Sequence, residues 1–173
     1  MDGTAEATMR LRAPELHGRG RRVVAAGGPL ELAQGEVELR SAQGALEWRG
    51  AVLAAELDGG WSSTFALPDG GAPTPLAECF SAHGRTLTLE VDLAAAAALQ
   101  TDAGREDPEL ASRALRALVA EGGIEVTGPN LRAKGQAARR DPGSAVTWLT
   151  GDPAQVQRGG LSYRGRRLEL ELR

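Results

Sequence analysis

The residues best suited to metal or nucleophilic chemistry are few in this chain and widely spaced. Cys79 and His83 lie four positions apart, and His17 is the only other histidine. A zinc site needs three or four convergent Cys, His or carboxylate ligands. A nucleophilic triad needs a histidine base beside a serine or cysteine, and no Gly-x-Ser-x-Gly motif is present. We therefore expect no catalytic site, no metal and no cofactor, and we interpret Cys79 and His83 as ordinary strand residues.

Other kinds of binding chemistry are also weakly supported. Gly18-Arg19-Gly20 and Gly159-Gly160 lack the Lys-Ser/Thr context of a phosphate-binding loop. The net charge is −3, from 20 basic and 23 acidic residues, so nothing indicates a nucleic-acid partner. Paired carboxylates could support acid–base catalysis, but most acidic residues here alternate with apolar ones. That alternation is typical of the solvated outer face of a sheet.

Composition indicates one domain with an aliphatic core. The chain has 173 residues, of which 42% are hydrophobic and only 3% aromatic, so a single core would consist of Leu, Val and Ala. The single cysteine excludes an intramolecular disulfide. No apolar run approaches the roughly 18 residues of a membrane span. Residues 1–4 lack the features of a signal peptide, so we expect any localisation signal to lie outside this chain.

A short strand pattern that occurs twice gives the clearest view of the elements. Residues 84–91 read Gly-Arg-Thr-Leu-Thr-Leu-Glu-Val, and residues 165–172 read Gly-Arg-Arg-Leu-Glu-Leu-Glu-Leu. Alternation of this kind places the apolar side chains on one face of a half-buried strand. Similar alternation recurs along the chain between turn signals spaced roughly 8–10 residues apart. These patterns predict an all-β fold of roughly a dozen short strands in a sandwich, barrel or roll.

Glycines and prolines predict where the strands end. Residues 68–76 hold three prolines and two glycines and should form a loop. Residues 94–115 differ, because five consecutive alanines and the capping signal Asp107-Pro108-Glu109 predict one short inserted helix. Residues 1–173 are therefore expected to form one β domain with this insertion. Turns are expected at Gly27-Gly28, Gly35, Gly44, Gly50, Gly59-Gly60, 128–130, Gly135, 141–143, 151–153 and 159–160.

An apolar inner face is the remaining functional candidate. If the two halves of the sheet form an open or V-shaped roll, inward side chains would line a groove. Such a groove accepts acyl chains, since burial contributes roughly 0.8 kcal/mol per CH₂. The same side chains could instead fill each other's space as an ordinary core. The candidate lipid contacts are Leu87, Leu89, Val91, Val126, Leu131, Val146, Trp148, Leu168, Leu170 and Leu172.

The C-terminal third carries a more specific pattern. Its segments are 119–126 (Val-Ala-Glu-Gly-Gly-Ile-Glu-Val), 133–138 (Ala-Lys-Gly-Gln-Ala-Ala), 140–153 (Arg-Asp-Pro-Gly-Ser-Ala-Val-Thr-Trp-Leu-Thr-Gly-Asp-Pro) and 161–170 (Leu-Ser-Tyr-Arg-Gly-Arg-Arg-Leu-Glu-Leu). This run resembles the OstA-like family of periplasmic lipopolysaccharide-transport proteins, the LptA/LptC type. The sequence pattern of that family is A-x-G-x-V-x-V, then A-x-G-x-x-A-x-Y-D-P-x-T-G-x-V-x-L-T-G-x-P, then G-x-R-L-x-L-x-L. The N-terminal half matches this family only in the alternation of its strands and the spacing of its turns.

The resemblance implies an open antiparallel β-jelly-roll, or "taco", whose interior holds the acyl chains of lipopolysaccharide or a similar lipid. It also implies periplasmic, non-catalytic lipid transport between the inner and outer membranes, with edge strands that pair with other OstA-like jelly-roll domains. Arg140 stands where the family usually has tyrosine, and the 94–115 insertion is unusual for it.

Two alternatives to lipid transport remain open. One is a structural or assembly roll that pairs edge to edge without lipid. The other is a hydrolytic or sugar-binding jelly roll. That reading needs an aromatic-rich groove, which three tryptophans and one tyrosine hardly supply.

Overall fold

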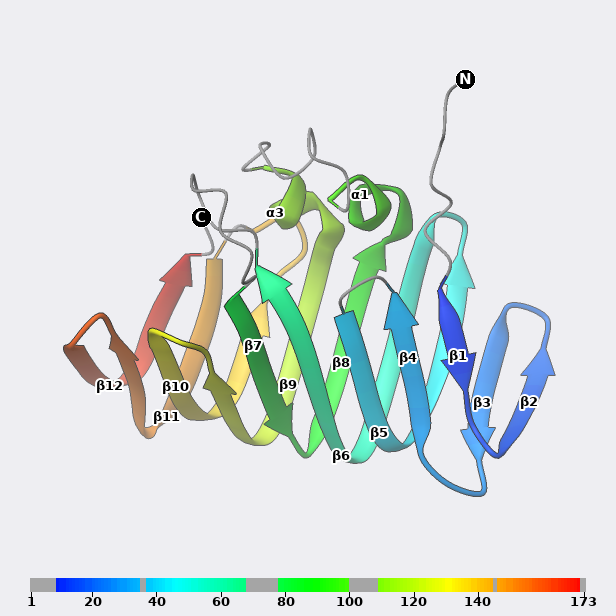
Figure 1. Ribbon diagram of the computed structural model, residues 1–173, viewed down its shortest axis with the longest axis horizontal. Helices are drawn as coiled ribbons and strands as arrows, with labels where there is room; N and C mark the ends of the chain where they lie inside the picture. Colours follow the sequence, from blue (N-terminus) through cyan, green and yellow to red (C-terminus); the bar gives the residue numbers. More distant parts are fainter. Residues whose placement is uncertain (1–8, 35–36, 68–77, 100–108, 145, 172–173) are drawn as a thin grey trace.

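The computed structural model describes residues 9–34, 37–67, 78–99, 109–144 and 146–171. These residues form one 12-stranded antiparallel sheet and two short helices (Figure 1), which confirms the prediction of an all-β open roll. In chain order the elements are β1 (Arg10–Arg12), β2 (Glu15–Arg19), β3 (Arg22–Ala26), β4 (Leu30–Gln34), β5 (Val37–Arg49), β6 (Val52–Leu67), β7 (Glu78–Gly84), β8 (Thr86–Asp92), α1 (Leu93–Ala98), α3 (Leu110–Ala114), β9 (Leu115–Thr127), β10 (Leu131–Arg140), β11 (Val146–Arg158) and β12 (Leu161–Glu171).

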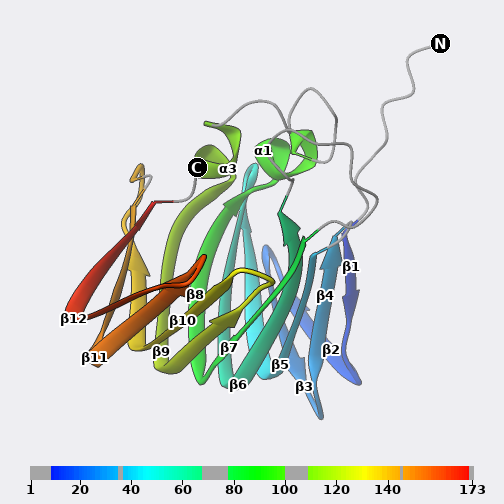
Figure 2. The ribbon, with the colours of Figure 1, turned by 60° about the vertical axis from the view of Figure 1, so that its left-hand side comes forward.

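The sheet is folded into two facing leaves, because each long strand runs through both of them. The first half of β6 pairs with β8 and its second half pairs with β7, and β9 divides in the same way. We call these the β7 leaf, which also contains β1 and β4, and the β8 leaf, which also contains β2 and β3. Strands β5, β6 and β9 to β12 contribute one half to each leaf; Figure 2 brings the β11–β12 end forward.

The leaves meet along a crease where the long strands bend. Gly59-Gly60 on β6 and Gly122-Gly123 on β9 adopt positive φ, a region that favours glycine. The register shifts where β9, β10, β11 and β12 cross the crease, as it does at a β-bulge that bends a strand. Neighbouring strands stay bonded there: the Gly60 N–H donates to the Arg85 carbonyl, and the Arg85 N–H donates to the Glu121 carbonyl.

Two further glycines allow close packing at this crease. A Cβ at Gly135 would lie 2.7 Å from both Leu149 Cδ1 and the Thr150 carbonyl oxygen. A Cβ at Gly84 would lie 2.9 Å from Trp61 Nε1. Interiors are packed densely enough that even one added methyl group is felt. Any side chain at these positions would therefore push apart the groups that form the bend.

The two copies of the repeated strand occupy equivalent places in the sheet. Gly84-Arg85 and Gly165-Arg166 both lie at the crease, between a segment in the β7 leaf and one in the β8 leaf. The alternating residues that follow the Gly-Arg pair in each copy form β8 and the second half of β12. The repetition in the sequence thus marks where the chain bends from one leaf into the other.

Several glycines that predicted turns lie inside strands instead. The prediction that strands end there is wrong, because at these positions glycine bends or closely packs a continuous strand. These positions are Gly44 in β5, Gly59-Gly60 in β6, Gly135 in β10 and residues 151–153 in β11. The chain does turn or bend at residues 27–28, 50–51, 129–130, 142–143 and 159–160. Gly35 and residues 68–76 lie outside the described residues.

The prediction of a helical insertion at residues 94–115 is confirmed, although the described residues form two short helices, α1 and α3, where one was expected, and β9 begins at Leu115. The structure shows a cap that the sequence analysis did not identify: Asp92 Oδ1 accepts hydrogen bonds from the N–H groups of Ala94 and Ala95, each at 3.1 Å. Asp107 and Pro108 lie outside the described residues. Both helices lie along one rim of the sheet, α1 beside β8 and α3 beside β9 (Figure 1).

Buried side chains from both leaves form the main core, and Leu46, Leu53 and Ala55 form a second, smaller cluster. Leu87 and Leu149 come from the β8 leaf, and Trp61 and Ile124 come from the β7 leaf. Many of the buried apolar residues are small, which lets the leaves approach closely. The buried alanines are Ala25, Ala55, Ala82, Ala114, Ala120, Ala133, Ala138 and Ala154.

Substitution of Gly135 by alanine should destabilise the fold through overpacking at the crease. We expect Gly135→Ala to lower the free energy of unfolding by about 1–3 kcal/mol, measured by urea denaturation followed by circular dichroism. Gly18→Ala is the matched control, because the nearest heavy atom to its new Cβ is 3.9 Å away; it should be neutral or slightly stabilising. Equal denaturation midpoints for the two variants would contradict the steric role of Gly135.

Candidate functional site

The apolar inner face gathers most of the candidate lipid contacts. Leu87 is buried in the core. Five further candidates are partly buried and pack against the same core: Leu89, Val126, Leu131, Leu168 and Leu170. Val91 is also partly buried, and it pairs with Leu53 on β6 and Leu115 on β9. The structure therefore brings seven of the ten candidates to one face, where they contribute to packing between and along the leaves.

Val146 and Trp148 lie on the opposite face, so their placement among the inward residues is wrong. Directly paired residues of antiparallel strands share a face. The buried Leu149 pairs with Ala138 and Leu168. Its neighbour Trp148 pairs instead with Arg139 and Glu169, both exposed.

The error arose from a run of adjacent apolar residues. Trp148 and Leu149 are both apolar, so the alternation of apolar and polar residues could place either one on the inner face. The structure shows that Thr147 and Leu149 share the inner face. Leu172, the last candidate, lies outside the described residues.

Trp148 has a different partner on the outer face. The guanidinium carbon of Arg167 lies 3.6 Å from the centroid of the Trp148 ring, which is a cation–π arrangement. The two residues come from neighbouring strands, β11 and β12. This contact fixes the tryptophan against the outside of the β8 leaf.

Two polar side chains are buried among the described residues, Ser41 and Arg140. Ser41 Oγ lies 2.8 Å from the Gln43 carbonyl oxygen and 3.1 Å from that of Asp58, so it links β5 to β6 at the crease. Arg140 shares the inner face with Ala138 and is 2% exposed. Burial lowers the pKa of its guanidinium from the ordinary value. The inner face is thus apolar with one buried cation near the end of β10.

The β12 end of the inner face is the most open part of it. Tyr163 pairs with the buried Val156. Leu161 lies two residues before Tyr163 in β12, so it points to the same face, and it pairs with Arg158. Leu161 and Tyr163 therefore lie on the inward side of the last strand. They are 61% and 51% exposed, compared with 45% for Leu16 at the opposite end of the sheet, which pairs with the buried Ala25. Neither residue was among the candidates predicted from the sequence, although the alternation of residues 161–164 places both on one face of a strand.

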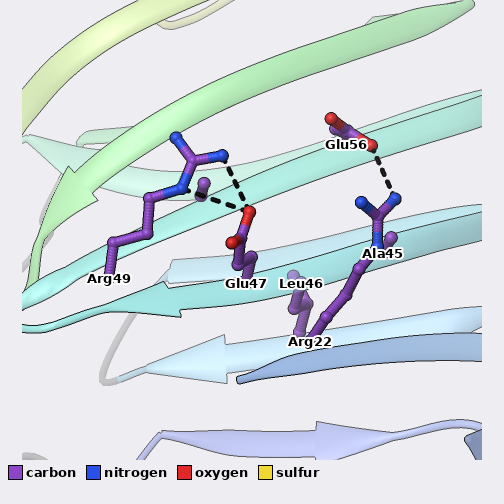
Figure 3. Close-up of a pocket in the computed structure, with 7 residues that line it drawn as sticks. Arg22, Ala45, Leu46, Glu47, Arg49 and Glu56 are labelled. Carbon is purple, nitrogen blue, oxygen red and sulfur yellow. Dashed lines mark hydrogen bonds and ion pairs between the residues drawn. The ribbon is translucent and has the colours of Figure 1, made fainter. Parts of the chain in front are cut away.

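A small hollow lies on the outer face, between β3, β5 and β6 (Figure 3). Its volume is about 10 Å³, which leaves room for one water molecule at most. Ion pairs surround it: Arg22 lies 3.1 Å from Glu56, and Arg49 lies 2.7 Å from Glu47. The hydrogen bond from Arg49 lowers the pKa of Glu47. The hollow is therefore a gap between surface salt bridges, and it is too small to hold a substrate.

Other titratable groups do not converge in the part of the chain that the structure describes. No three described His, Cys, Asp or Glu residues are grouped so that they could hold a metal ion. His83 Nε2 lies 3.8 Å from Glu125 Oε2 on the exposed side of β7 and β9, and His17 is paired with Glu15. None of the described helices has the length and apolar character needed to cross a membrane.

Comparisons with known proteins give no further guide to the site. No protein-family model matches the chain, and no curated protein matches it significantly.

Adjacent residues on β11 test the assignment of the two faces. Leu149→Ala should lower the free energy of unfolding by about 2–5 kcal/mol, because it leaves a cavity in the core. Trp148→Ala should lower it by only about 1 kcal/mol, since it removes a partly exposed ring and its contact with Arg167. Both values can be measured by urea denaturation. A larger loss for Trp148→Ala would reverse the faces that the strand register assigns.

Proposed function

We propose that this chain is a non-catalytic lipid-binding domain that carries lipopolysaccharide or a related acylated lipid between inner and outer membranes. One observation carries the proposal: a single sheet is bent so that its apolar inner face continues through both leaves from β1 and β3 to β12. Such a face suits linear acyl chains, because each buried CH₂ contributes roughly 0.8 kcal/mol. The resemblance to OstA-like proteins supports the same function and a periplasmic location.

The acyl chain would enter at the β12 end. Leu161 and Tyr163 already expose apolar surface there, whereas further in the leaves are packed against each other. Many inner residues are alanines, which make fewer dispersion contacts than leucines and are therefore easier to separate. Binding would replace contacts between the leaves with contacts to the lipid. Beyond the entrance, the acyl chain would next contact Leu168 and Leu170.

Charges placed at this entrance should block lipid binding. A Leu161→Glu/Tyr163→Glu double variant puts two carboxylates on the acyl path, and burying either against a lipid chain is costly. We expect the acylated lipid that co-purifies from an envelope-bearing host to fall at least about tenfold, the equivalent of roughly 1.4 kcal/mol. Mass spectrometry of organic extracts measures the bound lipid.

The matched control places the same charges on the outer side of the same hairpin. Gln155 and Ser162 are exposed and lie on the face opposite Tyr163. Gln155→Glu/Ser162→Glu should keep the lipid content of the wild-type chain, with folding of both variants checked by circular dichroism. Absence of acylated lipid from the folded wild-type protein, or an equal loss in both double variants, would contradict the proposal.

The second candidate function is an assembly module that pairs edge to edge without lipid. The observation that favours it is β12, an 11-residue strand at one end of the sheet that pairs with β11 alone among the described strands. Exposed edges of this kind are templates for strand addition.

A further inference from the structure

Two neighbouring turns at the β12 end of the β7 leaf form a basic tip. The turn between β9 and β10 lies beside the turn between β11 and β12, because the Gly159 N–H donates to the Asn130 carbonyl oxygen at 3.2 Å (Figure 1). Residues 128–135 and 154–165 form these turns and the strand segments that run from them toward the crease, and we call them the basic tip. They include four basic residues and no acidic one. The whole chain has a net charge of −3, so positive charge is concentrated here.

The cations of the basic tip come from three neighbouring strands. Arg132 lies on β10, Arg158 on β11 and Arg164 on β12, and all three are exposed. None of these three arginines forms an ion pair with a described carboxylate. The fourth cation is Lys134, whose Nζ lies 4.0 Å from Glu125 Oε2. Most of this positive charge is therefore available to anionic groups outside the chain.

Large apolar side chains are exposed among these cations. Leu161 and Tyr163 have the highest exposed fractions of the large apolar side chains in the described part of the chain. Leu161 pairs directly with Arg158, and Arg164 follows Tyr163 in the sequence. The basic tip thus offers water both unpaired positive charge and apolar surface.

This combination is typical of elements that bind the surface of an anionic bilayer. Each Lys or Arg beside an anionic leaflet strengthens binding several-fold. Amphipathic elements bury their apolar side chains roughly 5–10 Å into the boundary between headgroups and acyl chains, where tyrosine is enriched. Leu161 and Tyr163 are about 7 Å apart along their strand, so both fit within this layer. A soluble polyanion would use the cations but would leave these two side chains in water.

We propose that the basic tip docks this chain on the surface of a bilayer that contains anionic phospholipid. Leu161 and Tyr163 would enter the headgroup layer, while the three unpaired arginines would contact lipid phosphates. Docking of this kind would place the β12 end of the inner face against the bilayer. The inference goes beyond lipid carriage and does not rest on it, because it requires only reversible contact with the bilayer surface.

Sedimentation of the full chain with lipid vesicles tests this docking. We expect the chain to bind vesicles in which about one lipid in three is phosphatidylglycerol at least about tenfold more tightly than vesicles of phosphatidylcholine alone. Added salt should reduce this difference, because the cations are exposed. Equal binding to both kinds of vesicle, or binding to neither, would overturn the proposal.

Substitution of two arginines locates the charged contact. Arg132→Glu/Arg164→Glu should weaken binding to the phosphatidylglycerol vesicles at least about tenfold. Arg19→Glu/Arg21→Glu is the matched control, because it makes the same change in net charge at exposed positions of the β2–β3 hairpin, at the opposite end of the sheet. It should weaken binding far less. An equal loss in the two variants would show that net charge alone decides binding, which contradicts a docking site at the basic tip.

Substitution of the exposed apolar pair separates insertion into the bilayer from charge attraction. Leu161→Ala/Tyr163→Ala keeps every charge but should weaken vesicle binding at least about fivefold, because less apolar surface enters the bilayer. Leu16→Ala/Val24→Ala is the control, since it removes exposed apolar side chains from the β2–β3 hairpin; it should leave binding unchanged. Circular dichroism checks the folding of every variant. If Leu161→Ala/Tyr163→Ala binds as tightly as the wild type, the contact is that of a polyanion site and the proposal fails.

The composition of the vesicles keeps this test separate from lipid carriage. The vesicles lack lipopolysaccharide, and the protein is stripped of bound lipid before it is mixed with them. Loss of vesicle binding by a chain that still co-purifies with acylated lipid would contradict docking alone. Vesicle binding by a chain that co-purifies with no lipid would contradict lipid carriage alone.

Discussion

The bend at the crease is the constraint on which the rest of the structure depends. Each long strand must turn from one leaf into the other while its neighbours remain paired, and this demands residues that tolerate unusual backbone angles or very close contacts. Gly59-Gly60 and Gly122-Gly123 supply the backbone angles, and Gly84 and Gly135 allow the close contacts. Because neighbouring strands bend side by side, the leaves face each other and share the main core.

The sequence predicted the fold class because alternation is a local signal. A strand that is buried on one face must repeat apolar residues with a period of two, so the chain could be recognised as all-β without knowing which strands pair. The bends could not be predicted in this way. Glycine inside a bent strand and glycine in a turn look alike in sequence, and only the pairing of β6 with both β7 and β8 separates the two.

The candidate site shows the same division between local and long-range information. Leu87, Leu89 and Leu168 were placed correctly on the inner face, because strict alternation surrounds each of them. Trp148 was misplaced because Leu149 beside it is equally apolar, and the choice between them is made by Ala138 on the neighbouring strand. The exposure of Tyr163 depends on β12 being the last strand, a property of the whole sheet that no local pattern contains.

Because every long strand passes through both leaves, the cross-section of the interior and its length are set by different features of the chain. The distance from the crease to the rim sets the cross-section of the interior, and it is determined by the length of each half-strand. The length of the interior is determined by the number of bent strands laid side by side, at roughly 4.8 Å for each. A roll of this design can therefore be lengthened or shortened by whole hairpins such as β11–β12 while its cross-section stays the same. The length of its interior therefore depends on how many bent strands the chain contains.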